Sequence, residues 1–387
     1  MRPEPADRSA PILPPAVIGI LGGGQLGRML GMAARAMGYR IVVLDPDPDC
    51  PAAAVADKVV PARYDDVGGA LRLADLCDVV TYELEHIAAD TVRAIEPHVP
   101  VRPGVEPLVA TQDRLAERRF VESVGVGVAL WREVRSVPDA RSVIGSLDPP
   151  LRLKVPVGGY DGRGQIRITT VDQLDDAWER LGRGPGAPLL AERELDFECE
   201  LSVVVARGAD GTTATYPVSR NRHDEGILVE TVAPAPIEEG IAATARAIGT
   251  DLAVAMDLRG TLTAELFLLR DGSLVVNELA PRVHNSGHWT IEGARTSQFE
   301  NHLRALLGLP LGDTRVNGVA AMVNLIGETP DPASLLEIEG SHLHLYGKPA
   351  RPGRKLGHVT LVEPDRAALQ AALARVASVV DEPSLSR

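Results

Sequence analysis

The sequence lacks a long hydrophobic run, a signal peptide and a framework of paired cysteines. Its longest apolar runs, Ile41–Leu44 and Leu201–Ala206, are far shorter than the roughly 20 residues that span a membrane. The first 16 residues are rich in proline and include acidic residues, so we expect residues 1–15 to form a disordered lead-in. The three cysteines, Cys50, Cys77 and Cys199, have neither disulfide nor metal-ligand spacing. These absences predict a cytoplasmic protein with no membrane partner.

Positive charge is also scarce. The chain has 40 Lys and Arg against 53 Asp and Glu, a net charge of −13, which argues against nucleic acid or an anionic membrane as partner. Only four of the basic residues are lysines: Lys58, Lys154, Lys348 and Lys355. Because arginine is used nearly everywhere else, a lysine beside glycines indicates a position that needs a compact ammonium group.

The 387 residues predict two or three domains. Over residues 16–105, short apolar strands alternate with helical patterns, as in an open parallel sheet. The predicted strands are 17–21, 40–44, 58–61 and 78–82, and the predicted helices are 25–37, 66–76 and, leading out of the sheet, 107–124.

From about 128 to 300, strands predominate and predict an α+β body of mainly antiparallel sheet. The predicted strands are 128–134, 151–155, 165–169, 189–192, 198–206, 213–217 and 227–232, with a hairpin of 260–269 and 273–279. Helices are predicted before residue 182, over 238–256 and over 297–307, and a small β-rich cap follows. The expected fold therefore combines α/β and α+β parts: the lead-in, a parallel-sheet domain over 16–110, a central domain over 111–306 and a C-terminal domain over 307–387.

The first glycine cluster, Gly22 to Gly27, matches G-x-G-x-x-G, and Asp45 follows at the end of the next strand. Such a turn at a helix N-terminus suits a dinucleotide phosphate. The motif has low specificity, because many α/β domains turn tightly after their first strand.

The second cluster is more specific. Lys154 ends a strand, and Gly158, Gly159, Gly162 and Gly164 follow, with Arg163 among them, before the next strand. A plain hairpin needs about two residues. The longer glycine loop flanked by cations predicts a lid whose backbone N–H groups fold onto phosphates.

The Asp271-Gly272 pair is a strong signal for a two-residue hairpin turn. With that turn, Glu265 lies directly opposite Glu278 on the same face, with Cβ atoms roughly 5 Å apart. Two carboxylates so close repel unless a cation or a shared proton intervenes. Carboxylates that face bound phosphates are the usual ligands of Mg²⁺, so the pair predicts a metal site.

Two further segments concentrate polar groups. Residues 277–289 (NELAPRVHNSGHW) leave a strand with Arg, His, Asn and Ser side chains that a core does not need. Residues 347–355 (GKPARPGRK) form a basic loop in an acidic protein, which suits a phosphate monoester. The lone histidines His86, His98 and His302 are interpreted as surface or packing residues. No Ser–His–Asp order, Cys nucleophile motif or zinc spacing is evident.

The segments GGGQLGRM, GGYDGRGQ, NELAPRVHNSGHWT and RPGRKLGH together resemble the 5-(carboxyamino)imidazole ribonucleotide synthases, a family of ATP-grasp ligases of purine biosynthesis. The resemblance covers residues 16–365. It implies an ATP-grasp fold with a Rossmann-like first domain, a small β-rich C-terminal domain and a homodimer. It also implies that ATP phosphorylates bicarbonate to carboxyphosphate, which then carboxylates the amine of 5-aminoimidazole ribonucleotide. Bicarbonate is a poor electrophile, so charge neutralisation at the γ-phosphate is the main task.

The resemblance further implies a nucleotide site in which Arg114 and Lys154 contact phosphates. Its members are Arg114, Lys154, Gly159, Tyr160, Asp161, Gly162, Arg163, Gly164, Gln165, Glu192, Arg193, Glu194, Leu195, Glu200, His223, Asn277 and Glu278. Residues 159–165 would form the lid, 192–195 the strand edge that reads adenine, and Glu200 the ribose contact. Glu265 and Glu278 would hold Mg²⁺ or Mn²⁺.

On the acceptor side, the resemblance implies that Arg282 and His284 handle bicarbonate and carboxyphosphate, while Asp161 takes or relays the amine proton. The residues implied to bind the ribonucleotide are Gln25, Leu26, Glu83, Asn285, Lys348, Arg354 and Lys355, the last three near its 5′-phosphate. Lys355 is also implied in catalysis. The first glycine motif would then serve this substrate and not NAD.

Three alternatives stay open from the sequence. Another ATP-grasp ligase, such as a formate-using transformylase, would act on a different ribonucleotide amine. An NAD-dependent oxidoreductase would use Gly22 to Gly27 and Asp45. A non-catalytic nucleotide-binding regulator would have lost carboxylates or loop residues, and here none is lost.

Overall fold

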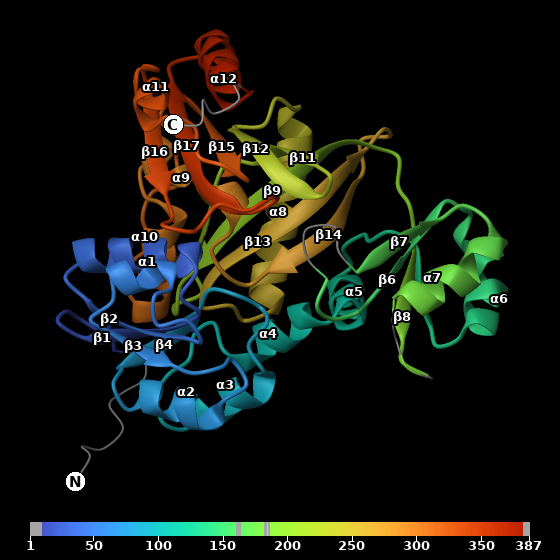
Figure 1. Ribbon diagram of the computed structural model, residues 1–387, viewed down its shortest axis with the longest axis horizontal. Coiled ribbons are helices and arrows are strands. Elements are labelled where there is room, and N and C mark those ends of the chain that lie inside the picture. The colour runs from blue at the N-terminus through green and yellow to red at the C-terminus, as the bar shows by residue number, and fades with distance from the viewer. Residues whose placement is uncertain (1–9, 160–163, 182–183, 185, 382–387) are drawn as a thin grey trace.

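The computed structural model describes residues 10–159, 164–181, 184 and 186–381, and its strands form three sheets (Figure 1). The N-terminal sheet has four parallel strands in the order β3-β2-β1-β4, as predicted. Its strands are β1 (Val17–Leu21), β2 (Arg40–Asp45), β3 (Lys58–Pro61) and β4 (Val79–Tyr82).

Both faces of this sheet are covered because its strands are apolar on both sides. Helix α1 (Gln25–Ala36) and helix α10 (Gln298–Leu307) pack on the face of Ile18 and Ile41. Helices α2 (Val67–Ala74) and α3 (Ala89–Ile95) pack on the opposite face. The N-terminal sheet is thereby anchored to a helix from late in the chain.

The expected disordered lead-in is wrong for residues 10–15. The N–H of Ile12 donates to the carbonyl of Leu307 at 2.9 Å, and the Tyr39 hydroxyl donates to the carbonyl of Ile12 at 2.7 Å. Ile12 also packs against the apolar cluster beside α1 and α10. Residues 1–9 lie outside the described part of the chain.

The single helix predicted over 107–124 is in fact two helices, α4 (Val105–Gln112) and α5 (Arg114–Ser123). Asp113 separates them with extended φ and ψ angles of −117° and 118°. Its carboxylate accepts hydrogen bonds from the N–H groups of Leu115 and Ala116, so it caps α5. The break places Arg114 at the start of α5, where its N–H donates to the carbonyl of Pro156 at 2.9 Å.

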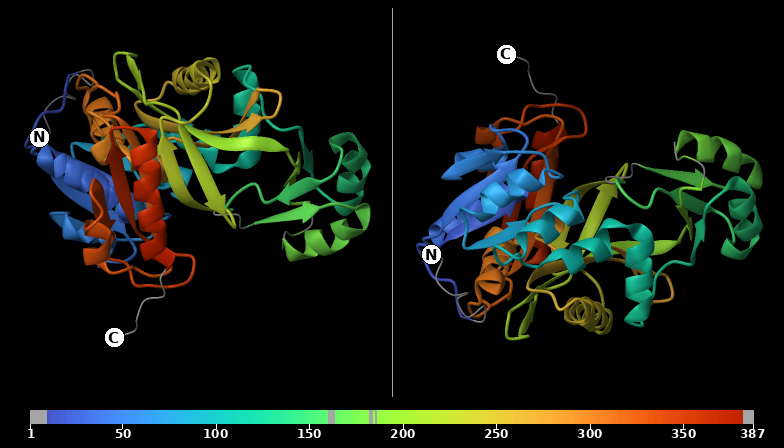
Figure 2. Two further views of the ribbon diagram at one scale, coloured as in Figure 1. Left: turned by 90° about the horizontal axis from the view of Figure 1, so that it is seen from above. Right: turned by 90° about the horizontal axis from the view of Figure 1, so that it is seen from below.

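A second sheet of four antiparallel strands, in the order β5-β8-β6-β7, lies at the opposite end of the molecule from the N-terminal sheet (Figure 2). Its strands are β5 (Trp131–Val134), β6 (Leu151–Lys154), β7 (Gln165–Ile168) and β8 (Leu189–Arg193). Helix α7 (Leu174–Arg180) was predicted, whereas α6 (Val137–Leu147) was missed. Both helices cover one face of this sheet.

The third sheet has nine strands and joins the central body to the C-terminal region. Its order is β14-β13-β9-β11-β12-β15-β17-β16, and β10 pairs with β9. The strands are β9 (Phe197–Arg207), β10 (Thr213–Thr215), β11 (Ser219–Asp224), β12 (Ile227–Ala233), β13 (Gly260–Leu269), β14 (Leu274–Ala280), β15 (Val319–Ile326), β16 (Ser341–Leu345) and β17 (Lys355–Glu363). The β-rich cap therefore extends the central sheet across the pairing of β12 with β15.

Helices α8 (Glu239–Ala255), α9 (Thr290–Gly293), α11 (Pro332–Leu336) and α12 (Arg366–Asp381) complete the fold. Strand β11, with the sequence SRNRHD, was missed because it has no apolar residue. No helix in the described ranges is long and apolar enough to cross a membrane.

The hairpin of β13 and β14 has a three-residue loop, so the predicted two-residue turn is wrong. The Leu269 N–H donates to the Ser273 carbonyl at 2.9 Å, which leaves residues 270–272 in the loop. Gly272 has a φ of 83°, the left-handed conformation that closes many three-residue hairpins. Beyond this loop, Leu266 faces Val276, one residue away from the predicted register.

A bulge in β14 corrects that shift. Asn277 is the extra residue between Val276, which faces Leu266, and Glu278, which faces Glu265. The predicted carboxylate pair is therefore present, although the turn from which it was deduced is different. Two deviations of one residue cancel each other.

Candidate active site

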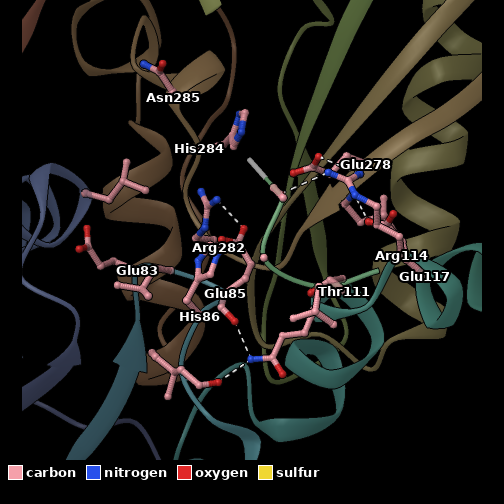
Figure 3. Close-up of a pocket in the computed structure, with 18 of the residues that line it drawn as sticks. Glu83, Glu85, His86, Thr111, Arg114, Glu117, Glu278, Arg282, His284 and Asn285 are labelled. Carbon is pink, nitrogen blue, oxygen red and sulfur yellow. Dashed lines mark hydrogen bonds and ion pairs between the residues drawn. The ribbon is translucent and has the colours of Figure 1, made fainter. Parts of the chain in front are cut away.

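Two adjoining cavities lie between the three sheets, with volumes of about 570 and 610 Å³. The first cavity is bounded by the N-terminal sheet and helix α4. The second cavity lies between the four-stranded antiparallel sheet and the nine-stranded sheet. Figure 3 shows the first cavity. Both are lined by Arg114, Glu278, His284, Asn285 and Lys355. A ligand in one cavity can therefore meet a ligand in the other at these side chains.

A buried ion-pair chain supports the second cavity. Lys154, at the end of β6, donates to one carboxylate oxygen of Glu192 at 2.5 Å, and Arg118 donates to the other at 2.7 Å. Despite burial, the two cations lower the pKa of Glu192 to about 2. Burial lowers the pKa of Lys154. The Glu192 side chain thus holds the lysine at the wall of the second cavity.

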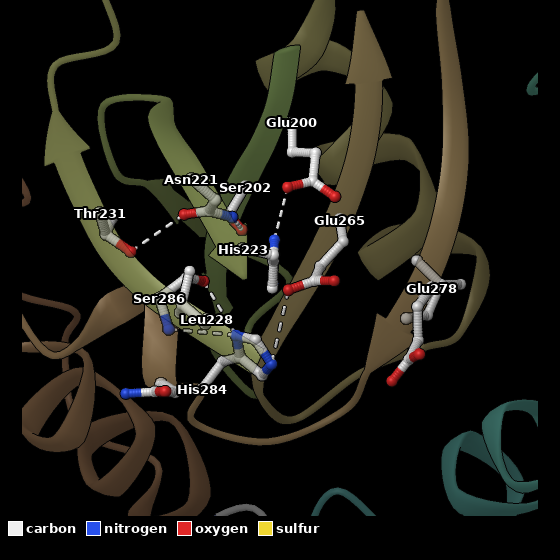
Figure 4. Close-up of polar contacts among 12 residues, drawn as sticks. Glu200, Ser202, Asn221, His223, Leu228, Thr231, Glu265, Glu278, His284 and Ser286 are labelled. Carbon is white, nitrogen blue, oxygen red and sulfur yellow. Dashed lines mark hydrogen bonds and ion pairs between the residues drawn. The ribbon is translucent and has the colours of Figure 1, made fainter. Parts of the chain in front are cut away.

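Glu265 and Glu278 are direct partners in the pairing of β13 with β14, and both line the second cavity. Figure 4 shows Glu265 beside His223 and His284. Burial and the charge of Glu278 raise the pKa of Glu265 to about 7. Arg114 lies 3.6 Å from Glu278 through Nη1 and donates from Nη2 to the carbonyl of Gly159 at 3.3 Å. This guanidinium therefore connects the carboxylate pair to the start of the glycine loop.

His284 presents a proton to this site. The Ser286 N–H donates to its Nδ1 at 3.2 Å, so the proton of the neutral ring lies on Nε2. Nε2 is 3.8 Å from Glu265. Burial, together with the charges of Arg282 and Lys355, lowers the pKa of His284, which keeps the ring neutral. A neutral ring with Nε2–H can donate a hydrogen bond to an anion.

On the neighbouring strands, His223 Nδ1 and Glu200 Oε2 are 2.5 Å apart. Burial lowers the pKa of His223, but the hydrogen bond and charge of Glu200 and the charge of Glu265 outweigh it and raise the pKa. Both residues line the second cavity. They form a polar wall on β9 and β11 opposite the second sheet.

In the first cavity, Arg282 forms an ion pair with Glu85, and its Nη1 donates to the carbonyl of Val283 at 2.9 Å. Its Nε is buried without a hydrogen-bond partner among the described residues. Arg282 lines the first cavity, so its guanidinium is a candidate contact for an anionic ligand.

Backbone N–H groups of the first glycine turn, Gly22 to Gly27, donate to carboxylates of the protein itself. The Glu83 carboxylate accepts hydrogen bonds from the N–H groups of Gly24 and Gly27, at 2.5 and 2.6 Å. Asp45 accepts from the N–H of Gly23 at 2.7 Å. These carboxylates occupy the donors that a dinucleotide phosphate would need, which is a physical reason to reject the NAD hypothesis.

Of the seven predicted acceptor-site residues, Asn285, Lys355 and three more line the first cavity, whereas Lys348 and Arg354 are not among its lining residues. Gln25, Leu26 and Glu83 line it. Lys348 donates to the side-chain oxygen of Gln25, and burial lowers its pKa to about 8. Arg354 donates to the carbonyl of Pro349 at 3.3 Å, within the basic loop.

Of the predicted nucleotide-site residues, eleven line the second cavity: Arg114, Lys154, Gln165, Glu192, Arg193, Glu194, Leu195, Glu200, His223, Asn277 and Glu278. Gly159 lines the first cavity instead. Gly164 has a φ of 71°, and its carbonyl accepts from the N–H of Val155 at 2.9 Å, at the base of the loop. Tyr160, Asp161, Gly162 and Arg163 lie outside the described residues.

Three family models match the chain in succession. They describe a ribonucleotide synthetase pre-ATP-grasp domain at 16–112, an ATP-grasp domain at 119–299 and a phosphoribosylaminoimidazole carboxylase C-terminal domain at 320–372. The N5-carboxyaminoimidazole ribonucleotide synthase of Brucella melitensis is 42% identical over 356 residues, which are 91% of this chain and 97% of that protein. This chain belongs to the N5-carboxyaminoimidazole ribonucleotide synthase family.

Solved structures agree with this assignment. The N5-carboxyaminoimidazole ribonucleotide synthetase from Thermus thermophilus has a TM-score of 0.89 and 43% identity, covering 95% of this chain and 100% of that chain. The Aspergillus clavatus synthase in complex with ADP and 5-aminoimidazole ribonucleotide has a TM-score of 0.87 and 31% identity, covering 95% and 99%. The predicted family, the ATP-grasp fold and the carbon–nitrogen ligase class are confirmed.

Several residues of this synthase site were not singled out from the sequence. They are Glu85, Glu117, Arg118 and Asn324. Asn324 on β15 exchanges two side-chain hydrogen bonds with Asn285, at 2.8 and 3.1 Å. The Glu117-Arg118 pair was visible only as two charges in a helix, and no periodic signal marks such a pair as buried. Among the lone histidines, His98 is exposed and His302 packs against Thr81 and Thr261, as expected, while the exposed His86 also lines the first cavity.

Proposed function

We propose that this chain uses ATP to carboxylate the exocyclic amine of 5-aminoimidazole ribonucleotide with bicarbonate, in purine biosynthesis. ADP, phosphate and 5-(carboxyamino)imidazole ribonucleotide are the products. The observation that carries the proposal is the meeting of the two cavities at Arg114, Glu278, His284, Asn285 and Lys355. A nucleotide in the second cavity can there transfer its γ-phosphoryl group toward an acceptor in the first.

The acceptor chemistry suits bicarbonate. Arg282 and His284 line the first cavity, where the guanidinium and the Nε2–H can bind the anion. A bicarbonate oxygen attacks the γ-phosphorus, and ADP leaves. The amine nitrogen then attacks the carbon of carboxyphosphate, the bond from that carbon to the phosphate oxygen breaks, and the amine loses a proton. Lys355 lies where both ligands meet and can stabilise the departing phosphate, while Asp161 is our candidate for the proton relay.

Glu265 and Glu278 would hold Mg²⁺ or Mn²⁺. Within the described ranges, no group of three or more His, Cys, Asp and Glu side chains gathers as a complete metal site. Two carboxylates nevertheless fit Mg²⁺, which commonly takes its other ligands from substrate phosphates and water. When bound, the ion neutralises charge on the phosphates of ATP. Arg114 and Lys154 add fixed positive charge, and the adenosine part would contact residues 192–195, Glu200 and His223.

The ribonucleotide would bind in the first cavity. Gln25, Leu26, Glu83 and Asn285 would surround its base and ribose, and Lys348, Arg354 and Lys355 its 5′-phosphate. The relative that binds ADP together with 5-aminoimidazole ribonucleotide supports this division into two subsites. A homodimer, a cytoplasmic location and domain boundaries near residues 110 and 306 belong to the same proposal.

The test is a measurement of ADP release by the purified chain with ATP and Mg²⁺. Release should require both bicarbonate and 5-aminoimidazole ribonucleotide, with the carboxylated product detected directly by ¹³C NMR from labelled bicarbonate. ADP release that is stimulated by glycinamide ribonucleotide and formate, but not by aminoimidazole ribonucleotide, would contradict the proposal.

A further inference from the structure

The bulge that places Glu278 opposite Glu265 lies on the outer edge of its sheet, because β14 is the last strand. On the outer side, Val276 donates to the carbonyl of Gly127 at 2.9 Å. The outward backbone groups around the bulge need partners from outside the sheet. Helix α5 supplies two of them. Arg118 Nη2 donates to the carbonyl of Asn277 at 2.9 Å, and Glu117 Oε1 accepts from the N–H of Leu279 at 2.7 Å. The residues on both sides of Glu278 are therefore held by one pair of side chains.

This pair is buried and internally matched. Glu117 and Arg118 are each 1% exposed, and Arg118 Nη1 donates to Glu117 Oε2 at 2.9 Å. Burial and the nearby charge of Glu278 raise the pKa of Glu117 to about 7, against the opposing effect of Arg118. Glu117 also lines the first cavity. Two charges are thus kept out of water at the one place where β14 departs from a regular strand.

Arg118 also reaches the second sheet. Its Nε donates to Glu192 Oε1 at 2.7 Å, and the other oxygen of Glu192 accepts from Lys154 at 2.5 Å. One guanidinium therefore contacts the bulge beside Glu278 and the carboxylate that holds Lys154. The three donors of Arg118 diverge in a fixed plane, which a lysine ammonium cannot reproduce.

We propose that Glu117 and Arg118 are positioning residues that fix the bulge at Asn277, and through it the direction of Glu278, relative to Lys154. This inference rests on the proposed function, because it assigns Glu278 to a metal and Lys154 to a phosphate. In this role the pair sets the spacing between the two groups that meet the phosphates of ATP.

The first experiment compares Arg118→Lys with Arg119→Lys. Arg119 is the next residue of α5, and it pairs with Glu133 on the surface. Mg²⁺ is varied in the ADP-release assay at saturating ATP, and the KM for the ribonucleotide is measured on the same protein. Arg118→Lys should raise the half-activating Mg²⁺ concentration about tenfold or more and leave the ribonucleotide KM within about twofold. Arg119→Lys should behave as the wild type.

A second pair tests the hydrogen bond to Leu279. Glu117→Gln keeps an oxygen acceptor for its N–H, whereas Glu117→Met does not. The glutamine variant should retain the Mg²⁺ dependence of the wild type within about threefold, and the methionine variant should show the tenfold weakening. Thermal midpoints and circular dichroism establish that each variant is folded.

A folded Arg118→Lys protein with wild-type Mg²⁺ dependence overturns the proposal. So does failure of both Arg118→Lys and Glu117→Met to fold, because the pair would then serve the fold alone. Binding of Mn²⁺ in the presence of ADP, followed by water-proton relaxation, gives a readout that needs no turnover. If the wild type lacks bicarbonate-dependent ADP release, the proposed function fails, while the Mn²⁺ comparison still decides whether this pair positions Glu278.

Discussion

The guanidinium of Arg282 forms an ion pair with the carboxylate of Glu85 in the first cavity. Both side chains are largely buried, and the Nε of Arg282 has no hydrogen-bond partner among the described residues. Because Arg282 lines the first cavity, an anion that enters there meets a guanidinium that is partly neutralised by an acid of the protein itself. Glu85 therefore competes with any anion that Arg282 binds.

Substitutions on the two sides of this ion pair should have opposite effects. Arg282→Lys should raise the KM for bicarbonate by about tenfold or more, because hydrogen bonds to charged groups contribute about 1.5–3 kcal/mol. Glu85→Gln should lower that KM about threefold, since it removes the competing charge. Steady-state kinetics with bicarbonate varied would measure both. Asp90→Asn is a suitable control, because Asp90 is exposed on α3. A bicarbonate KM that Glu85→Gln leaves unchanged would contradict the competition.

Glu278→Gln should abolish turnover while preserving the fold. The side chain is 44% exposed and 3.6 Å from Arg114, so its loss should change the free energy of unfolding by less than about 1 kcal/mol. Loss of one of two metal carboxylates should lower kcat by about a thousandfold or more. Urea unfolding and ADP release measure the two effects. Glu239→Gln, at an exposed glutamate on α8, should change neither. A variant that keeps a tenth of the activity would show that Glu278 is not a metal ligand.

Metal activation should depend on pH through Glu265. In the metal-free protein the pKa of Glu265 is raised from 4.5 to about 7, so below pH 7 a metal ion must displace a proton. The half-activating Mg²⁺ concentration should rise by about tenfold for each pH unit below 7, and level off above pH 8. Mg²⁺ titrations from pH 6 to pH 8.5 would measure this slope.

The stability of the metal-free protein gives an independent check on Glu265. The folded state binds one more proton at this residue than the unfolded state between pH 4.5 and about 7. The contribution of Glu265 to stability therefore falls as the pH rises through that window. Glu265→Gln should remove this part of the pH dependence in chelator-treated protein. An unaltered thermal profile in that variant would refute the raised pKa.

Lys348 should determine how ribonucleotide binding depends on pH. Burial lowers its pKa to about 8, so the ammonium that we assign to the 5′-phosphate is lost above that pH. The KM for the ribonucleotide should rise above pH 8, whereas the KM for ATP should not. Lys348→Met should raise the ribonucleotide KM about tenfold or more at pH 7 and remove the rise above pH 8. Lys58→Met, at an exposed lysine of β3, is the control. Equal effects of Lys348→Met on both KM values would count against the phosphate assignment.

Much of the fold could be predicted from local pattern. The parallel strands and the long strands β9 and β13 are apolar and bounded by turn residues, so their periodicity indicated them correctly. The boundary between α4 and α5 was missed, because a single Asp113 interrupts an otherwise helical pattern through its capping bonds. Strand β11 was missed because its side chains are polar and give no hydrophobic periodicity.

The carboxylate pair shows the limit of deducing strand register from a predicted turn length. Glu265 and Glu278 do face each other, but only because the bulge at Asn277 offsets a turn one residue longer than predicted. The residues that stabilise this bulge lie some 160 positions earlier in the chain, on α5. No local pattern could indicate a contact that depends on how α5 packs against the sheet edge.

The carboxylate that fills the first glycine turn also has a consequence for inhibitor design. In a dinucleotide-binding enzyme the corresponding turn offers N–H donors, so ligands for it carry phosphates or other acceptors. Here Glu83 covers those donors and presents its own oxygens beside Gln25 in the first cavity. A compound that directs hydroxyl or amino groups toward Glu83 would match this cavity and would lose affinity for the open turn of a dehydrogenase. Selectivity between the two kinds of enzyme can thus be obtained at the place where their sequences look most alike.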